Sequence, residues 1–489
     1  HRSLTISAPF PYWKRGGAVL IGACLIGLCI FGIRGRTGYN PIKVSAAYFC
    51  QDAFLNQLGV SPTFNLLTSV MDDMRPENKY LHLMDEQEAI TKAQALLNRP
   101  GDANVSPLAV YRRAAKADSV QQRRPNVVLI MMESMSAKFM KHFGQSETLT
   151  PFLDSLYTRS ISFRNFYSAG IHTNHGLYAT LYSFPAMMKR NLMKGSVIPR
   201  YSGLPTVLKE NGYYNLFFMT HEGQYDNMNA FFRTNGYDEV FSQEDYPADK
   251  VVNSFGVQDD FLYDYAIPVL NQRAATGQPF FATLLSISNH PPYVIPPFFH
   301  PKTSEPEMQI VEYADWALRQ FFEEARKQPW FDNTIFVLEG DHGKLVGDAE
   351  CELPESYNHI PLMIYSNRIQ PEEKTAFGGQ VDIQPTILGL LNIDYLQNNF
   401  GVDLLKEERP CMFYTADNMV VGRNDTLLYL YNYETQQELT YDIGNGKLNA
   451  VPMDDSFLPL KEYSFSMLQS AEFLVKHGKT LNSIPFTQQ

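Results

Sequence analysis

Residues 126–134 read NVVLIMMES, an apolar run that passes without a break into a carboxylate and a hydroxyl. No charged residue interrupts it before Glu133, and a continuous run of this kind is typical of a strand that is buried on both faces. Arg123, Arg124 and Pro125 lead directly into the run. The sequence therefore predicts a buried strand here, and we place the start of the main domain at residue 123.

Similar runs recur along the chain, separated by stretches of helical composition. The strand-like runs occupy residues 215–220, 280–287, 334–338 and 361–365, and the helical stretches include 259–273 and 308–327. Strands that alternate with helices form a mostly parallel sheet that helices cover on both faces. The sequence therefore predicts an α/β fold, a mostly parallel sheet sandwiched by helices. In such folds ligands bind at the carboxyl ends of the strands.

Titratable side chains stand at nearly every strand exit. Glu133 follows the first run, His221 the second and His290 the third, and Asp341 and His342 follow the fourth. Any one of them, taken alone, is well explained as a solvated loop residue. Four independent loops are not expected to place carboxylates and imidazoles at the same edge of one sheet. The set therefore predicts a functional site at that edge.

Three of these residues form a candidate ligand set for a metal ion. Asp341 and His342 are adjacent, on a turn that Gly340 opens and Gly343 closes, and Glu133 offers a third ligand from another strand end. Two carboxylates and an imidazole suit Mn²⁺, Zn²⁺ or Mg²⁺, and not a soft metal. A fourth position would be open to a nucleophile.

The candidate nucleophile is Thr173, in the stretch GIHTNHG at residues 170–176. A Thr hydroxyl is a weak nucleophile alone, but a bound dication lowers its pKa and supplies an alkoxide at neutral pH. We expect a helix to begin just after it, near Leu177, with Thr173 at the N-cap and backbone N–H groups aimed at a phosphate. Seen alone, the loop is equally consistent with a Thr that only caps the helix.

Five motifs stand out between Asn126 and Ile393: NVVLIMMES (126–134), TPFLDSL (150–156), FRNFYSAG (163–170), EGDHG (339–343) and GGQVDIQPTILGLLNI (378–393). With these motifs, in this order, the chain resembles the lipoteichoic acid synthase-like branch of the sulfatase superfamily. EGDHG and QVDIQPTIL are the most specific, whereas DHG alone would be weak. The resemblance implies the alkaline phosphatase and sulfatase fold.

The resemblance also implies roles for individual residues. Those that match the family's metal ligands are Glu133, Thr173, Asp341 and His342, with Thr173 as the hydroxyl that takes the phosphoryl group. Those that match positions holding the phosphate or the head group are His221, Arg233 and His290. The expected cofactor is one divalent cation, Mn²⁺ ahead of Mg²⁺ or Zn²⁺.

The chain departs from that family at several places. A Trp precedes the matching Arg by two positions in the family, whereas Phe231 stands there in this chain, and His172 and His175 surround Thr173. No CxPSR-type motif for formylglycine is present, which disfavours hydrolysis of sulfate esters. His359 raises the option of a second metal site of the two-metal phosphatase kind, although a plain loop histidine before a strand explains it as well.

Residues 17–33, GAVLIGACLIGLCIFGI, hold no charge and are just long enough to cross a membrane as a helix. Lys14, Arg15, Arg34 and Arg36 flank the segment on both sides, so charge alone does not orient it. A cleaved signal peptide is the competing interpretation, but the segment ends in IRGRTG and not in a cleavage site. We therefore expect a retained span in the cell membrane, with an extracytoplasmic catalytic body.

Four regions follow from these boundaries. We expect a membrane anchor at 1–36, the last helix of a membrane domain that can extend upstream, and a helical linker arm at 37–122. The catalytic domain is expected at 123–396 and a C-terminal subdomain at 397–489. In that subdomain, residues 411–415, 426–433 and 438–442 predict a small antiparallel sheet, and 455–476 predict a helix. We expect no functional side chains there.

Composition narrows the choice of partners. The chain of 489 residues carries a net charge of −11, which argues against nucleic acid as a partner. Hydrophobic residues make up 44% and charged residues 19%, as in a globular protein with a large core. The five cysteines have no ligand-like spacing and indicate no disulfide framework.

The expected function is metal-dependent transfer of a phosphate-bearing head group, phosphoglycerol from a phosphatidylglycerol-like lipid, through a phospho-threonine intermediate. The acceptor would be an envelope polymer or glycan. Three alternatives stay open: a phosphoethanolamine transferase, a phosphate or sulfate ester hydrolase of the same fold, and a non-catalytic member that binds a glycan or a protein. The intact Glu/Thr/Asp/His set argues against the last.

Overall fold

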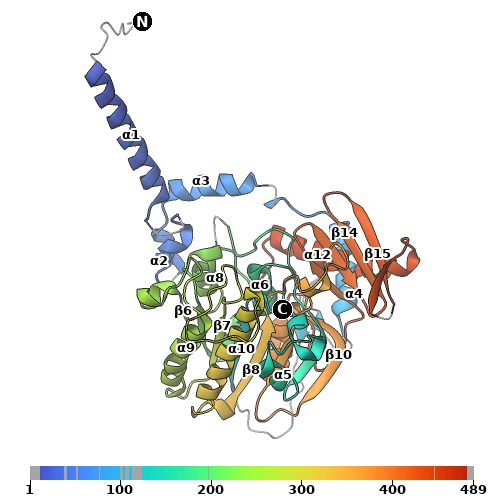
Figure 1. The fold of residues 1–489 in the computed structure, drawn as a ribbon. Helices are drawn as coiled ribbons and strands as arrows, with labels where there is room; N and C mark the ends of the chain where they lie inside the picture. The colour runs from blue at the N-terminus through green and yellow to red at the C-terminus, as the bar shows by residue number, and fades with distance from the viewer. Residues whose placement is uncertain are drawn as a thin grey trace, which may run out of the picture.

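The predicted run at residues 126–132 is strand β3 (Asn126–Met132), in the middle of an eight-stranded sheet. The sheet lies in the body of the molecule, from which the N-terminal helix projects in Figure 1. The computed structural model describes residues 12–37, 41–50, 53–75, 78–99, 103–104, 110–112, 124–195, 198–444 and 446–481. All seven residues of β3 are buried. Its neighbours on both sides, β8 (Thr334–Gly340) and β7 (Phe280–Leu285), run parallel to it. The strand is therefore covered on both faces and both edges, as its composition predicts.

The order of the sheet is β10-β4-β9-β8-β3-β7-β5-β6. The remaining strands are β4 (Ile161–Tyr167), β5 (Tyr214–Met219), β6 (Glu239–Phe241), β9 (Leu362–Tyr365) and β10 (Glu372–Gly379). Only β9 runs antiparallel to its neighbours among these eight strands. The connection from β8 to β9 contains a short 3₁₀ turn but no α-helix, so the chain returns from the edge that it has just left.

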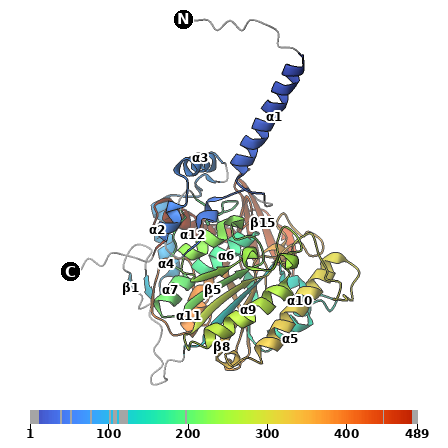
Figure 2. The same cartoon turned by 90° about the vertical axis from the view of Figure 1, so that its left-hand side faces the viewer.

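Alternate residues of β3 face two separate cores. Val127 and Leu129 pack into one, and Val128 and Ile130 into the other. The first core is covered by α6 (Thr173–Tyr182), α7 (Leu204–Glu210), α8 (Met228–Thr234) and α11 (Ile383–Leu390). The second is covered by α5 (Pro151–Tyr157), α9 (Asp259–Ala274) and α10 (Pro306–Ala325), as Figure 2 shows from the side. The predicted sandwich of helices around a mostly parallel sheet is confirmed.

The C-terminal part is a five-stranded antiparallel meander packed beside the main sheet. Its strands are β12 (Met412–Thr415), β13 (Met419–Arg423), β14 (Leu427–Asn432), β15 (Gln437–Gly444) and β16 (Lys447–Ala450). Helix α12 (Leu458–Lys476) packs against β13 and β12. The small antiparallel sheet was expected, although β13 and β16 were not recognised in the sequence.

The N-terminal part begins with α1 (Tyr12–Arg34), which is the one described helix long and apolar enough to cross a membrane, over Gly16–Arg34. Helices α2 (Ala53–Leu58), α3 (Pro62–Asp73) and α4 (Glu86–Leu97) follow it, and α4 packs against α12. The predicted linker arm is not purely helical, because β1 (Ala103–Asn104) and β2 (Val110–Arg112) pair with each other, and β2 pairs with β11 (Tyr395–Gln397). The division into four regions stays a prediction.

Candidate active site

Four neighbouring strands of the sheet deliver the predicted site residues other than Thr173 and Arg233. Strands β8, β3, β7 and β5 are consecutive and parallel, so their carboxyl ends meet at one edge. Glu133 follows β3, and Asp341 follows β8, where its backbone N–H donates to the Met132 carbonyl at 3.0 Å. His221 comes two residues after β5, and His290 comes five residues after β7. The order of the strands therefore brings the side chains at their carboxyl ends together at one edge of the sheet, as we inferred from the sequence.

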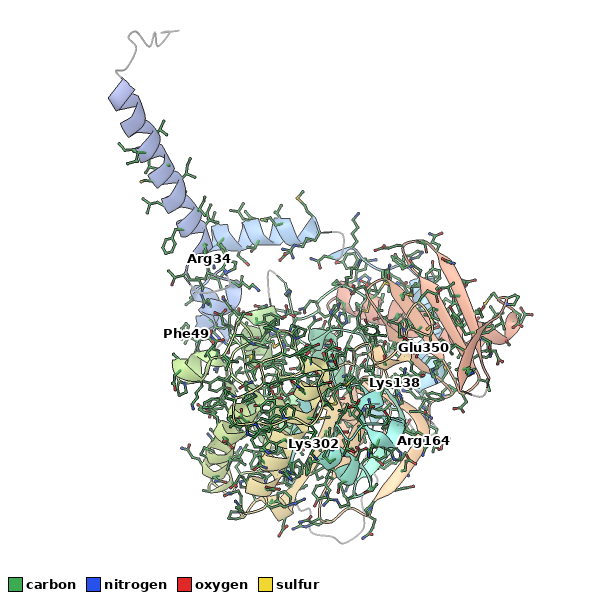
Figure 3. The ribbon with its side chains drawn as sticks, viewed as in Figure 1. Arg34, Phe49, Lys138, Arg164, Lys302 and Glu350 are labelled. Carbon is green, nitrogen blue, oxygen red and sulfur yellow. The ribbon has the colours of Figure 1, made fainter. Side chains whose placement is uncertain are left out.

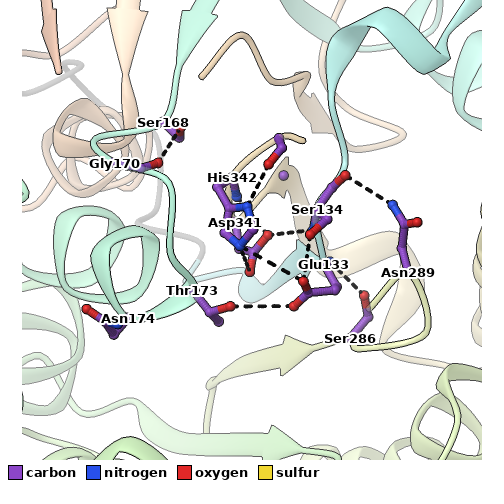
Figure 4. A network of polar contacts seen from close by, with 12 residues as sticks. Glu133, Ser134, Ser168, Gly170, Thr173, Asn174, Ser286, Asn289, Asp341 and His342 are labelled. Carbon is purple, nitrogen blue, oxygen red and sulfur yellow. Dashed lines mark hydrogen bonds and ion pairs between the residues drawn. The ribbon is translucent and has the colours of Figure 1, made fainter. Parts of the chain in front are cut away.

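Glu133, Asp341 and His342 form a group whose ligand atoms all lie within 4.8 Å of one another (Figure 4). The Nε2 atom of His342 lies 3.9 Å from Glu133 Oε1 and 3.6 Å from Asp341 Oδ2. Both carboxylates are buried, at 1% and 0% exposure. The three side chains come from two strands and point at one another.

Ser134 ties the two carboxylates together. Its hydroxyl donates to Glu133 Oε1 at 2.7 Å, and its backbone N–H donates to Asp341 Oδ1 at 2.8 Å. To do both, the residue adopts a φ of 49°, in the left-handed region that side chains other than Gly rarely occupy. Asn289 holds the turn from the other side by donating to the Ser134 carbonyl at 3.0 Å. The surrounding loops therefore fix the carboxylates before any ligand binds.

The glycines of the EGDHG turn are required by close packing of the backbone and not by a left-handed conformation. A Cβ on Gly343 would lie 2.0 Å from the Ser356 carbonyl oxygen, and the Gly343 N–H donates to the Tyr357 carbonyl at 2.8 Å. A Cβ on Gly340 would lie 2.5 Å from the Met135 carbonyl oxygen. The turn that carries Asp341 and His342 is thus pressed against two other backbone segments.

Two buried carboxylates this close cost free energy unless a cation balances them. Burial, reinforced by the charge of Asp341, raises the pKa of Glu133 well above its usual range. Asp341 Oδ2 is buried and accepts no hydrogen bond from the described residues, which leaves an acceptor aimed at His342 Nε2. An acceptor without a donor, two carboxylates and an imidazole fit a divalent cation by the chemistry of the donor set.

Thr173 lies beside this group, at the start of α6. Its Oγ1 donates to Glu133 Oε2 over 3.5 Å, which is a long hydrogen bond. The helix begins at Thr173 itself, and the N-cap is His172, which is extended with φ −133° and ψ 146°. Our expectation of a helix start near Leu177 with Thr173 as its cap was therefore wrong, because the chain turns helical immediately after the extended stretch. As the first residue of α6, Thr173 still has the unpaired N–H groups of a helix start around it.

A cavity of about 490 Å³ opens in front of Thr173 and brings three predicted imidazoles together: His221, His290 and His342 line it. Each directs Nδ1 at the carbonyl of the following residue, at 3.2 Å, 2.6 Å and 2.7 Å in that order. A carbonyl can only accept, so each Nδ1 must donate, and the neutral ring keeps Nε2 as its acceptor. The cavity is therefore presented with three imidazoles in one tautomer.

The two imidazoles that line the cavity outside the metal group, those of His221 and His290, differ in burial. His221 is 2% exposed, and this burial lowers its pKa. His290 is half-buried and packs against the Phe255 ring at a centroid distance of 4.0 Å. At neutral pH His221 is thus an uncharged acceptor, whereas His290 stays in contact with solvent.

Arg233 is not brought to the cavity. It lies on α8, where Nε donates to Asn229 Oδ1 at 2.8 Å and Nη2 donates to the Val240 carbonyl at 3.2 Å. Phe231, the residue that replaces the family's Trp, is fully buried among Tyr182, Tyr201 and Phe232. The role that the resemblance implies for Arg233 stays a prediction, and its contacts do not favour it.

The other histidines singled out in the sequence have different surroundings. His172 lines the cavity and pairs through Nε2 with Asp417 at 2.7 Å, whereas His175 is buried behind the turn, where burial lowers its pKa. His359 hydrogen-bonds the Arg164 carbonyl at 2.7 Å and stacks on Tyr167. Within the described part of the chain His359 joins no metal-ligating group, so it gives no support to a second metal site.

Two residues at the site were not predicted from the sequence. Lys344 lines the cavity and donates to Asn289 Oδ1 at 2.8 Å, and burial lowers its pKa to about 8. Its position in the same turn, two residues after His342, was an available signal. Asp417 reaches His172 from the β12–β13 connection. We expected no functional side chain in that region, and no local pattern marks one.

Comparison with known proteins places this site in a family. The model of the sulfatase family matches residues 125–393, which is more than half of the chain. The chain belongs to the sulfatase family. This membership confirms the expected sulfatase and alkaline phosphatase superfamily and an enzyme of that kind. Members of the superfamily use a divalent metal, and the group of Glu133, Asp341 and His342 is the candidate to hold one here.

Individual relatives agree with this assignment. Lipoteichoic acid synthase 2 of Bacillus subtilis is 24% identical over 315 residues, which are 58% of this chain and 47% of that protein. The chain spans about half the length of the curated relatives that it matches. A crystal structure of an alkaline phosphatase superfamily protein from Vibrio parahaemolyticus is 26% identical, with a TM-score of 0.73 over 82% of this chain and 98% of that chain. The lipoteichoic acid synthase LtaP from Listeria monocytogenes shares the fold, at 21% identity and a TM-score of 0.62 over 73% of this chain and 93% of that chain.

Proposed function

We propose that this sulfatase-family enzyme transfers a phosphate-bearing head group, phosphoglycerol from phosphatidylglycerol, to an envelope polymer or glycan through a phospho-threonine intermediate on Thr173. The observation that carries the proposal is the Thr173 hydroxyl at the start of α6, 3.5 Å from Glu133 Oε2, within a preformed group of two carboxylates and an imidazole. The similarity to lipoteichoic acid synthases supports the choice of donor and acceptor.

Glu133, Asp341, His342 and Thr173 would hold one divalent cation, which we propose to be Mn²⁺, with Mg²⁺ or Zn²⁺ as alternatives. When bound, such a cation lowers the pKa of the Thr173 hydroxyl and neutralises charge on the phosphoryl oxygens. The chain supplies the rest of the preorganisation, because Ser134 and the packed EGDHG turn hold both carboxylates in place.

In the first step, the ionised Thr173 Oγ1 forms a bond to phosphorus, and the bond from phosphorus to the glycerol oxygen of diacylglycerol breaks. The departing alkoxide takes a proton and leaves as neutral diacylglycerol. His290 is the better relay for that proton, because its half-buried ring reaches solvent and its Nε2 can take a proton from water and pass it to the alkoxide, whereas burial lowers the pKa of His221. In the second step, an acceptor hydroxyl forms a bond to phosphorus and passes its proton to His290 Nε2, and the bond from phosphorus to Thr173 Oγ1 breaks, so that Thr173 leaves as its alkoxide.

Recognition of the head group falls to side chains that line the cavity. Neutral His221 offers Nε2 as an acceptor, which suits the hydroxyl groups of a glycerol head group. The Lys344 ammonium, 2.8 Å from Asn289 Oδ1, stands where it can bind an anionic phosphoryl oxygen. We assign the phosphate contact to Lys344 ahead of Arg233, whose guanidinium bonds elsewhere.

A membrane setting completes the proposal. Helix α1 would cross the cell membrane, place the catalytic body on the extracytoplasmic side and keep it beside its lipid donor. The partners are then the membrane, the lipid donor and the polymer or glycan acceptor, and no nucleic acid. Two displacements on one residue also predict ping-pong kinetics.

The direct test is mass spectrometry of the full chain in lipid vesicles with Mn²⁺ and phosphatidylglycerol. We expect an adduct of glycerol-phosphate mass on the peptide that contains Thr173, and no adduct in the Thr173→Ser/His342→Ala double variant. Thr173→Ala should release no diacylglycerol. An adduct on another residue, or diacylglycerol release by Thr173→Ala at the wild-type rate, would show that the reaction does not pass through a phospho-threonine intermediate on Thr173.

The same experiment separates the rival head groups and acceptors. An ethanolamine-phosphate adduct, formed only with phosphatidylethanolamine, would replace the proposed donor by the phosphoethanolamine alternative. Release of free glycerol phosphate at full rate without any acceptor would identify a hydrolase. Retention of the adduct until a polyol phosphate or glycan is added supports transfer.

A further inference from the structure

Helix α3 (Pro62–Asp73) shows its apolar side chains to the outside of the protein. Leu66, Leu67, Val70 and Met71 are 65%, 61%, 50% and 63% exposed, and Met74, directly after the helix, is 77% exposed. Spacings of one, three and four residues place all five on one face. A contiguous exposed stripe of large apolar side chains is rare on soluble proteins and marks a surface that something else covers.

The opposite face of α3 is mostly polar and turned inward. Asn65, Thr68, Ser69 and Asp72 are each half-buried there, and Phe64 is the one large apolar residue among them. A helix that packs on a protein core has the reverse arrangement, with its apolar stripe buried and its polar residues in solvent. None of the residues that the structure describes covers the apolar stripe, so the inverted arrangement fits an apolar surface outside the described part of the protein.

The position of α3 identifies that surface. Figures 1 and 2 show α3 crosswise to α1, at the end of α1 that joins the body. Arg34, the last residue of α1, lies at the level of α3 in Figure 3. The residues of α1 that pass for a membrane span are 0% buried within the protein. If α1 crosses a bilayer, its C-terminal end lies at the lipid–water boundary, and α3 lies along that boundary.

Basic residues gather at the same level. A recess of about 330 Å³ between α3 and the body is lined by three cations, Lys43, Arg75 and Lys194, and by one carboxylate, Asp72. Arg34 and Arg36 follow the apolar part of α1. Cations beside an apolar stripe suit the phosphates of an anionic lipid surface, since the stems of Lys and Arg can lie along the apolar layer while the charges reach the head groups.

We propose that α3 is an interfacial helix, which docks on the surface of the membrane that α1 crosses. Leu66, Leu67, Val70, Met71 and Met74 enter the boundary of the acyl chains, and Lys43, Arg75 and Lys194 face the phosphate layer. The inference rests on the proposed membrane span of α1, but it does not depend on the chemistry at Thr173.

The docked helix lies close to the catalytic cavity. Lys194, in the recess beside α3, pairs with Asp226 at 2.8 Å, and Asp226 lines the cavity in front of Thr173. Asn174, the residue after Thr173, donates to the other oxygen of Asp226 at 3.3 Å. Contact of α3 with the lipid surface would therefore hold the cavity at the level of the head groups, and a single span could not fix that orientation alone.

Tryptophan scanning of α3 tests this directly. The full chain would be placed in vesicles of phosphatidylcholine and phosphatidylglycerol with brominated acyl chains, which quench Trp on contact. We expect Leu67→Trp and Met71→Trp to lose emission beyond the loss from native Trp13, Trp316 and Trp330. Ser69→Trp on the inward face, and Lys302→Trp on the body, should lose no more than wild type. Flotation of the vesicles reports separately whether the protein is inserted.

Stronger quenching at residues 67 and 71, on the outward face of α3, than at residues 69 and 302 supports the docked helix. Protein that floats with the vesicles but shows no quenching at residues 67 and 71 overturns it and leaves the proposed transferase intact. The docked helix is also overturned if the Trp side chains introduced at 67 and 71 are shielded from water but are not quenched by the lipid, because a second copy of the chain then covers the stripe. If the protein does not float with the vesicles, the proposed membrane span of α1 is wrong, and the docked helix is overturned with it. The Thr173 adduct test does not depend on this result.

Discussion

At the scale of single residues, we propose that Lys344, and not Arg233, is the cation that contacts the substrate. Lys344 lines the cavity, whereas the Arg233 guanidinium bonds to Asn229 and to the Val240 carbonyl. Lys344→Met should lower kcat/KM for phosphatidylglycerol by about 100-fold, as for loss of one preorganised donor. Arg233→Met should leave kcat/KM nearly unchanged and lower the free energy of unfolding by about 1–3 kcal/mol. Steady-state kinetics and denaturant titration measure both, and the reverse pattern would restore Arg233 to the site.

Gly343 offers a second test at this scale. In Gly343→Ala the new Cβ would meet the Ser356 carbonyl oxygen at 2.0 Å, so the turn carrying Asp341 and His342 has to move. We expect calorimetric titration to show Mn²⁺ affinity lowered by at least about 10-fold, the scale seen when supporting residues of a metal site are lost. Gly444→Ala is the control, since its Cβ would approach no closer than 3.4 Å to its neighbours. Equal affinity in both variants would contradict the account of the turn.

The site residues divide into those that local sequence marks and those that it does not. Glu133, Asp341 and His342 could be found because each stands directly after a strong apolar strand, and parallel strands end at one edge. Lys344 has no such mark beyond its neighbours in the turn. Asp417 lies 244 residues after Thr173 in the chain and meets His172 only because the C-terminal sheet packs beside the main one.

At the scale of elements, long apolar strands were predictable and edge strands were not. The run at 126–132 coincides with β3, and the expected helix at 259–273 is α9 with one further residue. Strand β10 (Glu372–Gly379) begins with two glutamates and is partly exposed, as edge strands are. Strand β4, which lies inside the sheet, has no continuous apolar run, because the exposed Arg164 and the half-buried Asn165 interrupt it. The periodicity of a single sequence does not say which strand pairs with which, or in which direction. The antiparallel direction of β9 therefore could not be predicted either.

One pair of helices is joined by a side chain whose titration can be followed. Asp315 of α10 accepts the backbone N–H groups of Phe152 and Leu153 at 2.9 Å each, at the start of α5. Burial raises the pKa of Asp315 to about 7, above its value in the unfolded chain. The folded state therefore binds more protons than the unfolded state between about pH 4 and pH 7, so this group makes stability fall as pH rises through that window.

A side chain at position 315 that does not titrate should make the free energy of unfolding depend less steeply on pH. Asp315→Asn should reduce the fall in unfolding free energy between about pH 4 and 7, by at most about 1.4 kcal/mol per pH unit. Asp249→Asn, at an exposed position, should leave the slope unchanged. Denaturant titrations at a series of pH values measure it. An unchanged slope in Asp315→Asn would show that this carboxyl does not titrate in that window.

At the scale of the whole molecule, a buried ion pair connects the C-terminal part to the main body. Arg409 donates through Nε to Asp382 at 2.9 Å and through Nη1 to the Tyr463 hydroxyl at 2.6 Å, and both charged side chains are buried. Asp382 stands just before α11, and Tyr463 belongs to α12. The pair thus contacts elements on both sides of residue 396.

Removal of Arg409 should therefore weaken the molecule as one unit. Arg409→Met leaves Asp382 buried without its counter-charge and should lower the free energy of unfolding by about 3–5 kcal/mol. Lys406→Met, which removes a half-exposed pair with Asp403, should cost less than about 1 kcal/mol. Near-ultraviolet circular dichroism should show one transition shifted to lower denaturant. Two separate transitions would mean that residues 397–489 unfold independently.

The proposed chemistry depends on a divalent cation that side chains from neighbouring strand ends hold against the Thr173 hydroxyl. An anomalous difference map at the manganese absorption edge, from crystals grown with Mn²⁺, would locate that cation. We expect a peak bonded to Glu133, Asp341 and His342, with Thr173 Oγ1 inside the same coordination shell. A map without a peak between these three side chains, or with Thr173 outside the shell, would contradict it.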